Sequence, residues 1–110
     1  MNRILNFFRS EIQGKEGIIN IDEKDFINFS SKADIKSFKL NYKLKEWWNK
    51  ETLKVQRLIF CIFIPEREIN KFQIDGISNF LTKLESLEQP IFGIYINNNL
   101  KRIKITLIFE

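Results

Sequence analysis

The apolar residues of the first segment are spaced as on one face of a helix. They are Ile4, Leu5, Phe8 and Ile12. Gly14 and Gly17 follow, and glycine commonly ends a helix. The pattern predicts an N-terminal helix over residues 1–16 whose apolar stripe packs in the core, with an amphipathic surface anchor as the alternative.

Four later stretches have the hydrophobic pattern of strands. In S-F-K-L-N-Y-K-L, residues 37–44, apolar and polar residues alternate, which predicts a half-exposed strand. The run L-I-F-C-I-F-I, residues 58–64, is continuously apolar, as is typical of a strand covered on both faces. The stretches I-F-G-I-Y-I, residues 91–96, and R-I-K-I-T-L-I-F, residues 102–109, flank an asparagine-rich connection and predict an antiparallel hairpin.

Helical patterns separate these strands. A helix or turn is expected over residues 26–36, a short helix around Trp48, and an amphipathic helix from Ile74 to Leu84. The order helix, strand, helix, strand, helix, strand, strand predicts an α+β fold. We expect a two-layer sandwich with a four-stranded mixed sheet and two to three helices, in which strands joined by helices are parallel.

Length and composition fit one domain over residues 1–110. The net charge of +4 biases association toward anionic partners only weakly. The single Cys61 lies in an apolar run, so we expect a buried thiol and no internal disulfide, as in a reducing cytoplasm. No apolar run approaches the ~20 residues of a membrane span, so a soluble, cytoplasmic protein is expected.

Candidate chemistry is confined to G-I-I-N-I-D-E-K-D, residues 17–25, where an amide and two carboxylates cluster at Asn20, Asp22 and Asp25. Asp and Asn also cap helices and build turns, so a structural role is the alternative. The chain has no histidine and none of the common phosphate-binding or nucleophile motifs. Neither a metal nor a cofactor is predicted.

Three stretches, residues 4–25, 57–84 and 89–109, together resemble the C-terminal half of FtsZ, the tubulin-like GTPase of bacterial cell division. The first is similar to the end of the family's central helix followed by its G-x-x-N-x-D-x-x-D synergy loop, here residues 17–25. The third is similar to the family's closing I-F-G hairpin. The family's GTP-binding domain has no counterpart in these 110 residues.

The resemblance implies that Gly17, Asn20, Asp22 and Asp25 face the GTP of a neighbouring subunit in a filament. A carboxylate there can orient the water that attacks the γ-phosphate, and an amide can fix geometry without adding charge. One departure is Glu23-Lys24, which stands where the family has Phe-Ala. This change removes an apolar anchor from the loop and places a cation that can pair with the acids.

The leading hypothesis is a polymer-interaction module that is not an enzyme alone. It would dock on the nucleotide face of an FtsZ/tubulin-like GTPase and cap or modulate filaments, with Asp22 and Asp25 contributing to GTP hydrolysis in trans. Self-association through the N-terminal helix is a further possibility.

Two alternatives remain open at this stage. The chain can be a fragment that complements a separately encoded GTPase half. It can also be a small basic module that binds nucleic acid through Trp47, Trp48 and the surrounding lysines, a less favoured reading. Lys101, Arg102 and Lys104 are expected at a solvated sheet edge, where lysine discourages strand addition, or on an exposed basic hairpin.

Overall fold

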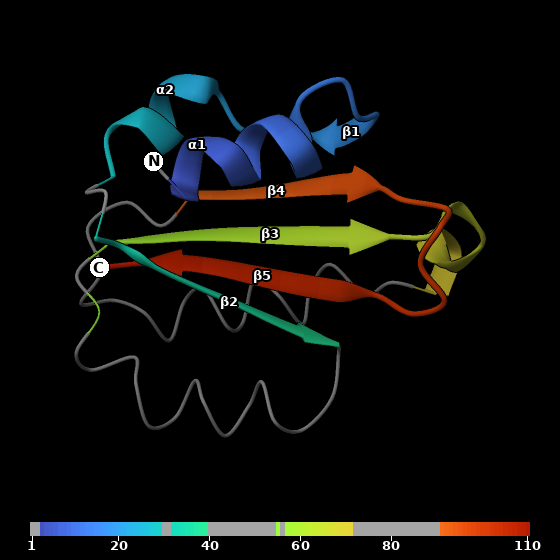
Figure 1. Ribbon diagram of the computed structural model, residues 1–110. Helices are drawn as coiled ribbons and strands as arrows, with labels where there is room; N and C mark the ends of the chain where they lie inside the picture. Colours follow the sequence, from blue (N-terminus) through green and yellow to red (C-terminus); the bar gives the residue numbers. More distant parts are fainter. Residues whose placement is uncertain (1–2, 30–31, 40–54, 56, 72–90) are drawn as a thin grey trace.

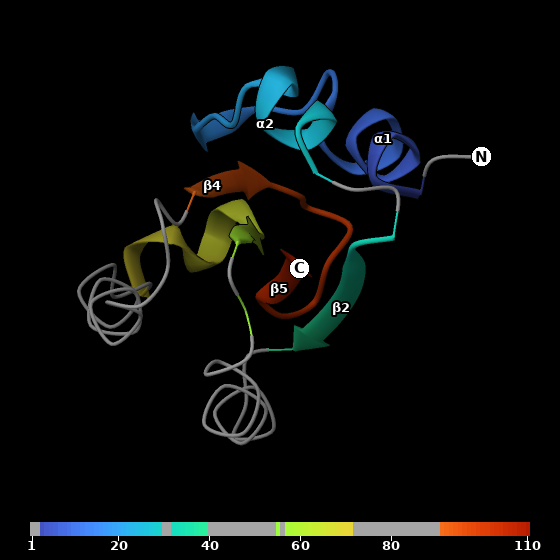
Figure 2. The same ribbon diagram turned by 90° about the vertical axis from the view of Figure 1, so that its left-hand side faces the viewer.

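A computed structural model describes residues 3–29, 32–39, 55, 57–71 and 91–110. These residues form a five-stranded mixed sheet with α1, η1 and α2 packed on one face (Figures 1 and 2). The elements are α1 (Arg3–Phe7), the π-helix η1 (Phe8–Ile12), β1 (Gly17–Ile19), α2 (Glu23–Ile27), β2 (Asp34–Lys39), β3 (Leu58–Ile64), the 3-10 helix η3 (Glu66–Lys71), β4 (Ile91–Ile96) and β5 (Lys104–Phe109). The predicted α+β class is confirmed.

The strands lie in the order β1-β4-β3-β5-β2. As expected for strands joined by a long connection, β3 and β4 are parallel, whereas the other neighbours are antiparallel. The predicted hairpin between residues 91–96 and 102–109 is wrong, because β3 lies between β4 and β5. The central position covers both edges of β3, the most apolar strand of the chain.

The predicted count of four strands is also wrong. Residues 17–19, expected in a loop, form β1 on the outer edge of β4. The strand predicted over 37–44 begins earlier, at Asp34, and its residues 40–44 lie outside the described part of the chain. Of the helix or turn expected over 26–36, the described residues show the end of α2 at Ile27 and turns at Asn28 and Lys32, whereas residues 34–36 belong to β2.

Strand β3 is buried along its whole length, as its continuous apolar run predicted. Its side chains alternate between two clusters: Leu58, Phe60, Ile62 and Ile64 on one face, and Ile59, Cys61 and Phe63 on the other. Burial raises the pKa of the Cys61 thiol well above its ordinary value. Cys61 is therefore an uncharged core residue, as expected from its apolar surroundings.

The N-terminal helix is formed by α1 and η1, and its apolar stripe packs in the core as predicted. Ile4, Phe8 and Ile12 are buried against the sheet. The helix closes with a hydrogen bond from the Gln13 amide to the Phe8 carbonyl, 2.8 Å long. Gly14 follows at φ 77°, in the left-handed region that favours glycine after a helix.

The helices predicted around Trp48 and from Ile74 to Leu84 lie outside the described residues, as do Trp47 and its neighbouring lysines. Among the helices of the described ranges, none has the length and apolar character of a membrane span.

Candidate functional site

The candidate site is built on residues 17–27, called the site segment below. It consists of β1, an irregular connection over residues 20–22, called the turn below, and α2. Strand β1 pairs with β4 in antiparallel register, with Gly17 opposite Tyr95 and Ile19 opposite Ile94. The register shifts between these pairs, so the chain turns away from the sheet directly after β1.

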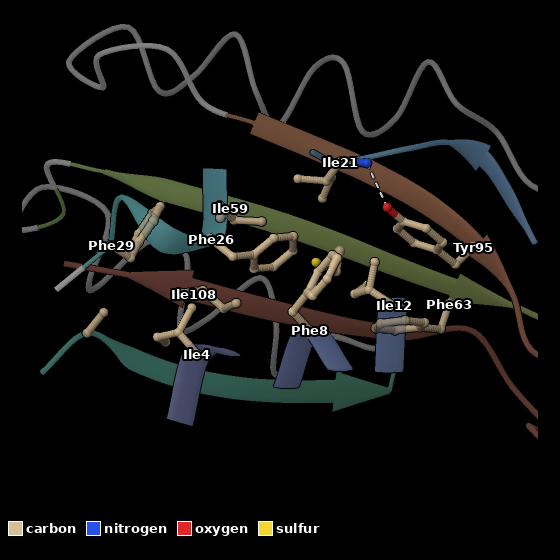
Figure 3. Close-up of a cluster of buried hydrophobic side chains, with 12 residues drawn as sticks. Ile4, Phe8, Ile12, Ile21, Phe26, Phe29, Ile59, Phe63, Tyr95 and Ile108 are labelled. Atoms are coloured by element: carbon tan, nitrogen blue, oxygen red, sulfur yellow. Dashed lines mark hydrogen bonds between the residues drawn. The ribbon is translucent and has the colours of Figure 1, made fainter. Parts of the chain in front are cut away.

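The side chain of Tyr95 holds the turn in place. The Ile21 amide donates a hydrogen bond to the Tyr95 hydroxyl, 2.6 Å long, and both residues are buried (Figure 3). Burial raises the pKa of Tyr95, and the opposing effect of this hydrogen bond does not cancel the increase. The phenol therefore stays neutral at physiological pH and remains a hydrogen-bond acceptor for the turn.

Two glycines let the turn approach the sheet. A Cβ added at Gly93 would lie 2.6 Å from Cγ1 and 2.8 Å from Cδ1 of Ile21, so the Ile21 side chain occupies the space over Gly93. A Cβ at Gly17 would collide with Oδ1 of Asn20. The Asn20 side chain thus folds back over Gly17, and a residue larger than glycine at either position would displace the turn.

Helix α2 is held by Phe26, which is fully buried. Its ring centroid lies 5.1 Å from that of Phe8 and 6.2 Å from that of Phe7 (Figure 3 shows Phe26 beside Phe8). The site segment therefore has two apolar anchors, Ile21 and Phe26. They hold the segment although the two residues between Asp22 and Asp25, Glu23 and Lys24, are charged and exposed.

Arg57 fastens the chain directly after α2. Its guanidinium donates hydrogen bonds to the Asn28 carbonyl, at 2.8 Å, and to Oε1 of Glu110, at 2.7 Å. The same group lies 4.6 Å from the centroid of the Phe29 ring. These contacts connect the end of the site segment to the ends of β3 and β5.

Asp22 stands at the N-cap position of α2, yet its carboxylate makes no capping hydrogen bond. The side chain is exposed. Within the described part of the chain, Lys24 forms no ion pair with Asp22 or Asp25. The Asp22 carboxylate is thus presented to solvent on a fixed backbone, and the structural role expected of an N-cap aspartate does not account for it.

The other candidate residues are placed differently. Asp25 lies in the first turn of α2 and is half-buried. Asn20 is exposed, but its contact with Gly17 gives it a part in shaping the turn. Of the predicted acids, Asp22 is therefore the one best placed to meet another molecule. The described residues contain no group of three side chains suited to hold a metal ion.

Two large apolar residues of the site segment are also exposed. Ile18 in β1 is 47% exposed and Ile27 at the end of α2 is 54% exposed. These are the exposed large hydrophobic residues of the described ranges, and both belong to the segment that carries the acids. Exposed apolar side chains beside polar groups are typical of protein-binding surfaces.

Tyr95 and Gly93 were not among the residues that the sequence indicated. Both lie in I-F-G-I-Y-I, which predicts a strand and resembles the I-F-G hairpin of the FtsZ family, but neither interpretation marks them as site residues. A glycine inside a strand pattern is a known signal of close backbone approach, and it would have pointed to Gly93. No comparable signal identifies Tyr95, because its partner amide lies 74 residues away in sequence.

Tyr95→Phe is expected to lower the free energy of unfolding by about 1–3 kcal/mol, because it leaves the buried Ile21 amide without an acceptor. Amide hydrogen exchange at Ile21 should accelerate more than at the centre of β3. Ser37→Ala is the control: it also removes a hydroxyl, one bonded to Thr106 at 2.9 Å on the β2–β5 pair. If both variants change Ile21 exchange equally, the turn does not depend on Tyr95.

Comparison with solved structures shows a likeness of fold. The structure is similar to "FtsZ dimer, empty (M. jannaschii)", with a TM-score of 0.50 and 16% sequence identity over 86% of this chain. The chain spans 32% of the length of that protein. No protein-family model matches the sequence, and no curated protein matches it either. The likeness establishes an FtsZ/tubulin-like fold, compatible with the FtsZ C-terminal domain.

Proposed function

We propose that this domain is a polymer-interaction module. It binds the nucleotide-bearing face of an FtsZ/tubulin-like GTPase through the site segment, and by doing so caps or modulates filaments of the kind that act in cell division. Asp22 is the main polar contact, and Ile18 and Ile27 are apolar contacts beside it. The observation that carries the proposal is the exposed carboxylate of Asp22, which makes no capping hydrogen bond to α2 and lies on a turn held by Tyr95.

Three features support this proposal. The fold is FtsZ-like, and the similar solved protein was described as a dimer of FtsZ. The site segment combines a free acid with exposed apolar residues, which suits a partner surface more than bulk solvent. Its backbone is also held by three contacts: the pairing of β1 with β4, the Ile21–Tyr95 hydrogen bond and the burial of Phe26. Docking would therefore require little ordering of the site segment.

GTP in this proposal comes from the partner. The 110 residues contain no glycine-rich phosphate-binding loop, so the domain offers an acid to a nucleotide that it does not hold. An Asp22 carboxylate near the γ-phosphate would orient the attacking water, and Asp25 would contribute less because it is half-buried. In this contact the domain supplies the carboxylate and the partner supplies the nucleotide.

The proposal is tested by adding the purified domain to a polymerising FtsZ GTPase. At micromolar excess, we expect less sedimentable polymer and a changed rate of GTP turnover. Asp22→Asn should reduce the change in turnover by at least about tenfold, because the amide cannot accept a proton or attract the water equally well. Glu23→Gln is the matched control, since Glu23 is adjacent, exposed and equally charged.

Unchanged polymer and turnover with the wild-type domain would refute the proposal. Equal effects of Asp22→Asn and Glu23→Gln would retain docking but remove the specific role of Asp22. Ile18→Asp and Ile27→Asp should each weaken co-sedimentation with the polymer, since a charge would be buried against the partner.

A further inference from the structure

A group of basic residues surrounds a hollow at the end of the sheet where the β4–β5 connection meets β2. The hollow has a volume of about 610 Å³. The 3-10 helix η3 lies at the same end of the sheet (Figure 1), and its Arg67 donates a hydrogen bond to the carbonyl of Leu100, one of the lining residues. The described residues that line this basic hollow are Lys39, Asn99, Leu100, Lys101, Arg102 and Lys104. The expected solvated edge is a poor description of it, because β5 is an interior strand.

Within the described ranges, the cations of the basic hollow have no counter-charge in an ion pair. Among the described residues, no carboxylate forms an ion pair with Lys39, Lys101, Arg102 or Lys104. Glu68 lines a neighbouring hollow together with Lys101 and Arg102. The described residues that line the basic hollow itself include four cations and no acid.

Lys39 and Lys104 are directly opposite each other on the antiparallel strands β2 and β5. Like charges at opposed positions of a sheet destabilise it. The Lys104 ammonium lies 5.8 Å from the centroid of the Phe63 ring, which keeps this cation at the sheet end. A bound anion between the two lysines would relieve their repulsion, so the pair itself points to an anionic ligand.

The connection that carries the other cations is held in place. The Arg67 guanidinium donates hydrogen bonds to the carbonyls of Leu100, at 3.0 Å, and Lys101, at 3.2 Å. The Asn99 amide donates to Oδ1 of Asn97, at 3.1 Å. The basic side chains thus project from a fixed backbone, and a ligand would not have to order it.

We propose that the basic hollow binds an acidic peptide segment of a partner protein, at a site independent of the site segment. Three of the four cations are lysines, which supply point charges, and Arg102 alone has a planar guanidinium, which also pairs well with a carboxylate. The lining residues described contain no aromatic ring on which a base could stack, whereas Leu100 offers an apolar contact for a side chain of the peptide. Carboxylates flanking an aliphatic residue match this combination.

The test uses a short fluorescein-labelled peptide of Glu and Asp around one central Leu. Fluorescence anisotropy should show micromolar binding that weakens steeply as the salt concentration rises. A control peptide in which Gln replaces Glu and Asn replaces Asp should not bind. Lys101→Glu/Arg102→Glu should weaken binding by about tenfold or more, because it reverses two of the four charges. Both residues are exposed, so the fold is expected to persist.

Arg9→Glu/Lys15→Glu is the matched control, since it makes the same charge change at exposed positions outside the hollow. It should reduce affinity by less than about threefold. Equal losses in both variants would mean that net charge alone attracts the peptide, and the proposal would fail. Tighter binding of an oligothymidylate of the same length would overturn the choice of an acidic peptide. Asp22→Asn should leave peptide binding unchanged, which separates this test from that of the proposed function.

Discussion

Phe26→Ala is expected to lower the free energy of unfolding by about 3–5 kcal/mol, the largest effect of any single truncation in the site segment. Phe26 is fully buried and its ring packs on Phe7 and Phe8. The loss approaches the whole stability of many small domains, which is ~5–15 kcal/mol. Urea denaturation followed by circular dichroism measures it.

The control for this truncation is the next residue. Ile27 belongs to the same helix but is 54% exposed, so Ile27→Ala should change the free energy of unfolding by no more than ~0.5 kcal/mol. Similar losses for Phe26→Ala and Ile27→Ala would contradict the placement of α2, because the helix face that meets the core would have to be different.

Gly93→Ala is expected to cost about 1–3 kcal/mol, because the added methyl group must displace Ile21 and the Tyr95 ring. The nearest Tyr95 atom, Cε2, would lie 2.9 Å from the new Cβ. Either shift moves the turn that carries Asp22. The variant should therefore lose both stability, measured by thermal unfolding, and binding to the GTPase polymer, measured by co-sedimentation.

A double-mutant cycle isolates the contact between Gly93 and Ile21. In an Ile21→Ala background, Gly93→Ala should cost less by ~0.5–3 kcal/mol, because both of the Ile21 atoms that the methyl group would meet are then gone. Gly14→Ala is a control of another kind: it has positive φ and no neighbour within 4 Å, so its cost of about 1 kcal/mol should not depend on residue 21. A Gly93 cost unchanged by Ile21→Ala would exclude the contact as its cause.

The elements that the sequence predicted well are those with a long, regular hydrophobic pattern. The continuous run of β3 and the helical stripe through Ile4, Phe8 and Ile12 specify both their type and their burial. Strand β1 has only three residues and no periodicity, so no local pattern could predict it. It forms because the edge of β4 is available for pairing.

Strand order was harder to predict than strand existence. An asparagine-rich connection between two strands favours a hairpin on local grounds, but β5 instead pairs with β3 and β2. The choice depends on which strand needs cover on both edges, which is a property of the whole sheet. Local turn chemistry does not contain that information.

The candidate site was predicted in its polar residues and not in its supports. Gly17, Asn20, Asp22 and Asp25 are visible as a cluster in the sequence, whereas the contacts of Gly93 and Tyr95 with Ile21 are not. Tyr95 lies on a strand that only the folded sheet brings beneath the turn. The sequence indicated the Asp22 carboxylate, but the position of this carboxylate depends on the Tyr95 hydroxyl, which the sequence did not indicate.

The distance in sequence between Ile21 and Tyr95, 74 positions, has a consequence during synthesis and turnover of the chain. The acid-bearing corner precedes Tyr95 by most of the domain's sequence, but it acquires its shape only when β4 has joined the other described strands. Nascent or partly unfolded molecules would lack a competent docking corner. If the domain has the proposed function, only molecules with a complete sheet would then compete for a filament.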